Sequence, residues 1–176
     1  GRVDERYLSI SVDLGQIATP TRFWNPSGPG EVTGRPPFDF TQARLRKMAS
    51  ALAPAYLRLA GTEADRVFYA LDEMWEAGTL APAPFQSVLT AGQIDDIGEF
   101  AHSAGFDIVF SVNAGWGTRG LNGAWQSDEA RALMQYVRAR GHPFAVWQLG
   151  NEPNAWPLFQ RGLLVTPEQY VRDMHS

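Results

Sequence analysis

A carboxylic acid and two amides stand together in the segment GNEPN, residues 150–154. The preceding residues 146–149, Val-Trp-Gln-Leu, predict a short buried strand that runs straight into this polar turn. Parallel barrel strands present catalytic side chains at their C-terminal ends, so this turn would face a substrate. A carboxylic acid can give and take a proton there, and a neighbouring amide can hydrogen-bond a hydroxyl. We therefore predict that Glu152 is a general acid/base and that Asn151, beside it, hydrogen-bonds a sugar hydroxyl.

The same segment also has an interpretation without chemistry, because Gly-Asn and Glu-Pro are common turn dipeptides. Its surroundings favour the catalytic interpretation. Trp147 and Trp156 flank the turn, and three earlier predicted strands also end in polar residues. A motif in the expected structural setting is a hypothesis about a site, and here that hypothesis depends on Glu152.

Three earlier strands are predicted from alternating or continuous apolar residues. The first ends at Asp13, the second in a Gly-Thr turn at Thr62, and the third at Asn113. Since substrate-facing residues are expected at these ends, Asp13 should face a substrate. The three strands are expected at residues 7–13, 56–62 and 107–113.

Four helices are predicted from apolar residues at helical spacing and from their end signals. Thr41 and Ser127 are expected to cap the first and third helices, and Thr166 opens a capping box for the fourth. Thr90 begins the second helix, which Gly105 ends. The apolar residues expected to face the core are Leu45, Met48, Ala49 and Leu52 in the first helix, Ile94, Ile97 and Ala101 in the second, and Leu133, Met134 and Val137 in the third.

Two long stretches, residues 14–39 and 114–125, are predicted to be irregular and to shape a site. The second contains glycines, two tryptophans, an arginine and an asparagine, all of which a carbohydrate site would use. Residues 63–76 are ambiguous between helix and strand. Arg58 lies inside a predicted strand, where a cation must be paired, and we expect it to bridge buried carboxylates.

Four strands alternating with helices predict an α/β fold with a parallel sheet. We interpret residues 1–176 as one unit, the N-terminal half of a (β/α)8 TIM barrel with about four βα repeats. A whole barrel of this type needs about 250 residues. The remaining strands are therefore expected outside this chain, and the open sheet edges predict that residues 1–176 alone would be insoluble or molten.

The composition argues against two classes of binding partner, nucleic acids and membranes. The net charge of -4, with scattered cations, argues weakly against nucleic acid. No apolar run is long enough to cross a bilayer, so no membrane partner is expected. The chain has no cysteine, which excludes disulfides and thiolate metal sites.

The segments YLSISVD, AYLRLAGTEAD, FDIVFSVNAGWGTRG and VWQLGNEPNAW resemble, in order and spacing, the N-terminal half of the heparanases and β-glucuronidases of glycoside hydrolase family 79. The resemblance spans residues 7–172, and its most specific part is LGNEPN combined with LRLAGT and SVNA. It implies a clan A barrel and a retaining mechanism with Glu152 as acid/base. The substrate residues that it implies are Asp13 and Thr62 at the uronic acid, Asn151 beside the scissile bond, and Asn113 and Ala114 in the loop lining the same cleft.

Three features depart from the mammalian heparanases. Their basic segment corresponds to residues 84–96, which contain no cation here, so strong heparin affinity from this segment is not expected. Residues 71–84 are too short for their excised linker, which makes the resemblance one to a bacterial, unprocessed form. The family's nucleophilic Glu lies on a later strand, and we expect it, with a small β-sandwich domain, outside this chain.

The resemblance implies a retaining β-glucuronidase of heparanase type that acts on glycosaminoglycan-like glycans, with endo cleavage favoured over exo. Its partners would be a polysaccharide or oligosaccharide containing glucuronic acid and the C-terminal fragment of the same protein, and it would need no metal or cofactor. A clan A β-glycosidase acting on neutral glycans and a non-catalytic carbohydrate-binding protein are the alternatives. A secreted or periplasmic location is expected, with the signal segment already removed.

Overall fold

A four-stranded parallel sheet forms the centre of the computed structural model, which describes residues 1–25, 28–32, 34–72, 75, 78–160 and 162–176. The strand order follows the chain, β1-β4-β7-β8, and every neighbouring pair is parallel. This confirms the predicted parallel series of strands. The strands span Ile10–Asp13 (β1), Ala55–Ala60 (β4), Phe106–Val112 (β7) and Phe144–Leu149 (β8).

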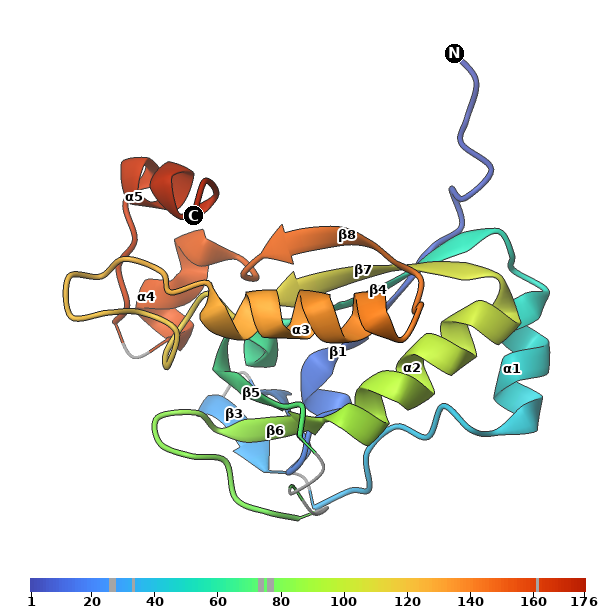
Figure 1. The fold of residues 1–176 in the computed structure, drawn as a ribbon, viewed down its shortest axis with the longest axis horizontal. Coiled ribbons are helices and arrows are strands. Elements are labelled where there is room, and N and C mark those ends of the chain that lie inside the picture. The colour runs from blue at the N-terminus through green and yellow to red at the C-terminus, as the bar shows by residue number, and fades with distance from the viewer. Residues whose placement is uncertain (26–27, 33, 73–74, 76–77, 161) are drawn as a thin grey trace.

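Helices connect consecutive strands of this sheet. In Figure 1, α2 and α3 lie along the same side of the sheet, and the arrows of β7 and β8 point toward the end of the molecule that carries α4 and α5. None of the described helices is long and apolar enough to cross a membrane. The helices are α1 (Ala43–Ser50), α2 (Ala91–Ala104), α3 (Asp128–Ala139), α4 (Trp156–Phe159) and α5 (Pro167–Asp173), with 3-10 turns η1 (Leu14–Gln16), η2 (Thr62–Arg66) and η3 (Pro153–Ala155).

Two small sheets depart from the sequence predictions. The stretch 14–39, expected to be irregular, contains an antiparallel pair, β2 (Arg22–Asn25) and β3 (Gly28–Val32). The ambiguous stretch after Thr62 becomes η2 and a strand, β5 (Val67–Ala70), which pairs in parallel with β6 (Ser87–Thr90). Both β5 and β6 have only four residues, too few for a periodic pattern to separate strand from loop.

The core lies between the sheet and its helices. Leu57 and Leu59 of β4 and Ile108 and Phe110 of β7 are completely buried, as alternate residues on one face of a pleated strand should be. The predicted apolar faces of α2 and α3 are confirmed, with Met134 only partly buried. The face of α1 is a correction, since Met48 and Leu52 are 62% and 44% exposed. Of the residues predicted to face the core, those that are fully buried are Ala49, Ile94, Ile97, Ala101, Leu133 and Val137.

The two outer strands of the sheet, β1 and β8, are paired on one side only in the part of the chain that the structure describes. Val146 of β8 is 42% exposed, so the prediction that this strand is buried holds only toward its end at Leu149. At the other edge Tyr7 and Leu8 are 77% and 65% exposed, and β1 begins at Ile10 rather than at Tyr7. Apolar side chains are therefore exposed along both edges.

The helix ends correct two of the predicted caps. Gln42, not Thr41, is the N-cap of α1, and Ser127 precedes α3 without a capping hydrogen bond. Thr90 makes the complete capping box of α2, because its hydroxyl accepts from the N–H of Gln93 (3.3 Å) while the Gln93 Oε1 accepts from the N–H of Thr90 (2.9 Å). Gly105 ends α2 with a φ of 75°.

Replacing Thr90 by Ala is expected to lower the free energy of unfolding by about 1 kcal/mol, because α2 loses a side chain that satisfies one of its free N–H groups. Equilibrium unfolding of the complete protein in urea measures this difference. Ser127→Ala is the matched control and should change stability much less, since that hydroxyl caps nothing. Equal losses in both variants would contradict the assignment of the cap.

Candidate active site at the carboxyl ends of the strands

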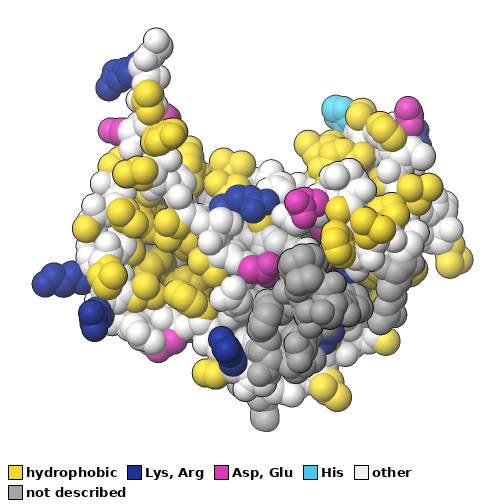
Figure 2. Space-filling view, turned by 180° about the vertical axis from the view of Figure 1, so that it is seen from behind, with side chains coloured by type: hydrophobic (Ala, Val, Ile, Leu, Met, Phe, Trp, Pro, Cys, Tyr) yellow, Lys and Arg dark blue, Asp and Glu magenta, His cyan; other side chains and the backbone are white. Residues whose placement is uncertain are grey.

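A polar pocket of about 300 Å³ opens where β1, β4 and β8 end. Asp13 is the last residue of β1, Thr62 follows β4, and Asn151 and Glu152 follow β8. Four of the six residues predicted from the sequence therefore line one pocket. In Figure 2, basic and acidic side chains lie beside each other in a hollow of the surface. Ser11, Arg58, Ala60 and Gly61 complete the lining.

Glu152 has an exposed side chain on a strained piece of backbone. Its φ of 49° and ψ of 58° lie in the left-handed region, and no other non-glycine residue in the described part of the chain has a positive φ. Such a conformation costs free energy and persists only where neighbouring contacts enforce it. Pro153 follows at the start of η3, and its ring fixes the exit of the turn. The backbone therefore holds a solvent-accessible carboxyl group at the pocket.

Hydrogen bonds at both ends of the Asn151 amide fix its orientation. Its Oδ1 accepts hydrogen bonds from Nη2 of Arg58 (3.1 Å) and from the N–H of Gly61 (3.3 Å). The amide nitrogen then faces the next residue, and Nδ2 donates to Oε2 of Glu152 (3.4 Å). The amide thus links strand β4 to the candidate acid.

Arg58 is paired, but with amides rather than with the buried carboxylates that the sequence led us to expect. Its Nε and Nη2 donate to Oε1 of Gln148, at 3.1 and 2.9 Å. Because no acidic group shares these hydrogen bonds, the positive charge of the guanidinium acts on the pocket itself. It helps to oppose the upward shift of the pKa of Asp13 described next.

Asp13 is held between the turn η1 and the backbone just after the neighbouring strand β4. Its Oδ1 accepts from the N–H of Gly15 (2.8 Å), the second residue of η1. Gly61 has a φ of 104°, and a Cβ there would lie 2.2 Å from Oδ2 of Asp13, so only glycine fits. Burial raises the pKa of Asp13, while the Gly15 hydrogen bond and the charge of Arg58 lower it. The carboxyl group is therefore held in a fixed orientation at the pocket.

The structure places Asn113 and Ala114 behind the pocket and not along it. Asn113 is 1% exposed, and its side chain is used by the backbone: Nδ2 donates to the carbonyl of Val67 (3.0 Å) and Oδ1 accepts from the N–H of Gly115 (2.8 Å). Ala114 is completely buried. These contacts shape the loop after β7 and leave no polar atom of the Asn113 side chain facing the pocket.

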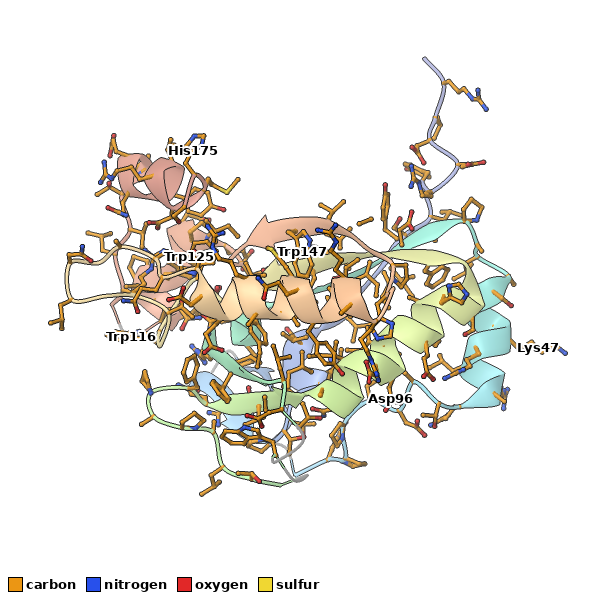
Figure 3. All side chains as sticks on the ribbon, in the orientation of Figure 1. Lys47, Asp96, Trp116, Trp125, Trp147 and His175 are labelled. Atoms are coloured by element: carbon orange, nitrogen blue, oxygen red, sulfur yellow. The ribbon has the colours of Figure 1, made fainter. Side chains whose placement is uncertain are left out.

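The two loop tryptophans that the sequence offered for carbohydrate binding fasten the loop instead. Nε1 of Trp116 donates to the carbonyl of Gln160 (2.6 Å), and Nε1 of Trp125 donates to the carbonyl of Asn113 (2.9 Å). Figure 3 shows both rings near the end of the molecule that carries α4 and α5, whereas Trp147 lies along β8. Trp116 is 40% exposed, whereas Trp125 is partly buried.

A buried ionic cluster lies behind Thr62 and was not predicted from the sequence. Arg66 pairs with Glu63 (Nη1 to Oε1, 3.0 Å), and its Nε donates to Oε1 of Gln160 (3.0 Å). Burial raises the pKa of Glu63, and the charges of Arg66 and Arg22 oppose that shift. Since Nε2 of Gln160 donates to the carbonyl of Thr62 (3.1 Å), the cluster fixes the floor of the pocket.

A second pocket, of about 330 Å³, lies between β8, α3 and α5 and is lined largely by Trp125, Met134, Trp147 and other apolar side chains. Its carboxylate, Asp173, is ion-paired with Arg119 (2.8 Å) and is not available for chemistry. In the described residues no three His, Cys, Asp or Glu side chains are grouped as metal ligands. The polar pocket with Asp13 and Glu152 is therefore the candidate active site.

Comparison with known proteins gives a family match. Residues 37–176 match the N-terminal domain of glycosyl hydrolase family 79. The chain is 28% identical to the heparanase of Mus musculus over 88% of this chain and 33% of that protein. It is 26% identical to the hyaluronoglucuronidase of Hirudo nipponia (83% and 33%) and 25% identical to the baicalin-beta-D-glucuronidase of Scutellaria baicalensis (98% and 36%). The chain spans about a third of the length of these curated relatives.

Proposed function

The chain belongs to glycosyl hydrolase family 79, and from this premise we propose that it supplies the acid/base half of a glycosidase that hydrolyses glucuronide linkages. The match confirms the family resemblance in the sequence. One observation carries the proposal: the exposed carboxyl group of Glu152 stands in a strained turn at the end of a parallel strand, beside an oriented amide and opposite Asp13. Side chains delivered in this way are typical of barrel glycosidases.

In the proposed reaction Glu152 protonates the glycosidic oxygen as the bond breaks and later removes a proton from the attacking water. A second carboxylate acts as nucleophile, at about 5–5.5 Å from Glu152, as in retaining enzymes. Asp13 is not assigned that role, because it is held between the N–H of Gly15 and the backbone of Gly61. We assign the nucleophile to a part of the protein outside residues 1–176, as the family resemblance implies.

The proposed substrate is a glycan containing glucuronic acid. The heparanase, hyaluronoglucuronidase and β-D-glucuronidase named above support this class of substrate. The pocket adds physical support, since the guanidinium of Arg58 and the hydroxyl of Thr62 both line it and both favour an anionic group. Asp13 and Asn151 would then bind the sugar hydroxyls. Endo cleavage and a secreted or periplasmic location belong to the same proposal.

The open sheet supports a further part of the proposal. Its four strands, β1, β4, β7 and β8, would form the first half of a (β/α)8 barrel. Both outer strands have an unpaired side in the described residues, and apolar side chains such as Val146 are exposed there. Strands that pair with these edges would cover that surface. A C-terminal part of the same protein is the proposed source of these strands, and the origin in a bacterial, unprocessed form stays a prediction.

Digestion of defined glucuronic-acid oligosaccharides by the complete protein is expected to release internal fragments with the β-configuration. An endo enzyme gives products of several lengths at early times, which mass spectrometry resolves by size. Proton NMR during the reaction reports the first anomer formed, and a retaining mechanism yields the β-anomer before mutarotation. Release of single terminal sugars would show exo action, and an initial α-anomer would contradict the retaining mechanism.

A further inference from the structure

Asp65 is a completely buried carboxylate directly behind the turn that carries Glu152. Its Oδ2 accepts hydrogen bonds from the N–H of Asn151 (2.9 Å) and from Nε1 of Trp156 (3.0 Å). Its Oδ1 accepts from the N–H of Ala114 (3.1 Å). Asp65 itself lies in η2, just after β4. One side chain therefore ties together the ends of β4, β7 and β8.

Asp65 hydrogen-bonds residues that lie before and after Glu152, the candidate acid, in the sequence. Asn151 precedes Glu152, and Trp156 follows it at the start of α4. The indole N–H of Trp156 also donates to the carbonyl of Asn151 (2.9 Å), so the ring closes the turn on itself. Gly150 packs so tightly here that a Cβ would lie 2.6 Å from the Trp156 ring and 3.1 Å from Oδ1 of Asp65. The left-handed backbone of Glu152 is thus clamped from its interior side.

The hydrogen-bond partners of Asp65 fit this role. All three of its partners donate N–H groups, which a carboxylate accepts and a protonated acid would partly oppose. Burial raises the pKa of Asp65 to about 7, although these hydrogen bonds and the charge of Arg119 lower it. A buried carboxylate is costly to keep, and a packing role alone would be filled as well by an apolar side chain.

We propose that Asp65 is a positioning residue, which holds the Asn151–Glu152 turn so that the carboxyl group of Glu152 projects into the polar pocket. The inference rests on the acid/base role proposed for Glu152. Asp65 touches no substrate, since it is sealed beneath the turn. Its effect on the reaction is geometric, and a displacement of about 1 Å at an acid is enough to lower a rate by about 10²-fold.

Asp65→Asn in the complete protein tests this, because the amide keeps the shape but turns an NH₂ group toward an N–H donor. For glucuronides with poor leaving groups kcat is expected to fall about 10²-fold with little change in KM. For aryl glucuronides with good leaving groups, which need less protonation, the loss should be several-fold smaller. In a Glu152→Gln background, Asp65→Asn should cause much less than its effect alone, because both act on the same step.

Asp173→Asn is the matched control. Asp173 is also buried (2% exposed) and also accepts three hydrogen bonds, from Arg119, Gln169 and the N–H of Trp125, but it anchors α5 and does not line the polar pocket. It should lower stability without distinguishing the two kinds of substrate. If Asp65→Asn also lowers both activities equally, Asp65 is structural only and the inference fails. Full activity of the Glu152→Gln variant would instead refute the proposed function. The two failures are therefore distinguishable, because they are read from different variants.

A second variant keeps the test informative if Asp65→Asn does not fold. Trp156→Phe retains a smaller aromatic ring and removes the N–H that donates to Asp65 and to the carbonyl of Asn151. Its loss should be smaller than that of Asp65→Asn and should again be greater for poor leaving groups. Equal loss on both kinds of substrate would overturn the positioning role.

Discussion

Glu152→Gln is expected to lower the hydrolysis of unactivated glucuronide linkages by about 10²–10⁴-fold, because an amide cannot donate and recover a proton. The structure makes this variant a clean test. The side chain of Glu152 is exposed and has one contact with another side chain in the described residues, from Nδ2 of Asn151. Glutamine preserves the size of the group, so the fold should be unaffected. Initial rates with a natural oligosaccharide measure the loss.

Substrates with good leaving groups separate an acid from other roles. An aryl glucuronide that departs without protonation should form the glycosyl-enzyme intermediate in the variant nearly as fast as in the parent protein. Stopped-flow detection of the released phenol measures this step. Glu99→Gln, an exposed carboxylate on α2, is the control and should leave both rates unchanged. Equal losses on both substrates would remove Glu152 from the acid/base role.

Much of the site was predictable because the signal is local. The strand Phe144–Leu149 and the turn after it are adjacent in sequence, so the apolar run and the Asn-Glu-Pro motif point to one place. Asp13 and Asn151 followed from the rule that parallel strands present substrate-facing residues at their C-terminal ends, and Thr62 followed from the family resemblance. The structure places all three in the polar pocket. The helix α2 was predicted within one residue because Thr90 and Gly105 mark both ends.

The rest depended on contacts between distant segments. Asp65 is 86 residues from Asn151, and no spacing in the sequence announces that hydrogen bond. Arg58 was expected to meet carboxylates, yet its partners Gln148 and Asn151 come from the fourth strand and its turn. Asn113 directly follows β7, which ends at Val112 rather than at Asn113 as predicted, and its amide is used by the backbone of its own loop and of Val67. Polarity at a strand end predicts a location, and the tertiary contacts then decide what the side chain binds.

The complete protein is expected to hydrolyse an aryl β-glucuronide about 10⁴-fold more efficiently, in kcat/KM, than the matched aryl β-glucoside. A site built to bind a polar group rejects an analogue that lacks it, because its own buried donors and charges are left unpaired. Arg58 supplies such a charge, since its hydrogen bonds go to uncharged groups, the amides of Gln148 and Asn151 and the hydroxyl of Ser11. The ratio of kcat/KM for the two substrates measures this discrimination directly, and their common leaving group cancels differences in the chemistry of departure.

Thr62→Val locates the source of the discrimination, because valine keeps the shape of the half-buried side chain and removes the hydroxyl that lines the pocket. We expect the glucuronide rate to fall by about 10- to 100-fold and the glucoside rate to change little, since one hydrogen bond to a charged group contributes about 1.5–3 kcal/mol. Thr41→Val is the control. The Thr41 hydroxyl is exposed, donates to Asp39 and does not line the polar pocket. A parent protein that cleaves glucosides as fast as glucuronides would refute the substrate assignment whatever the variants do.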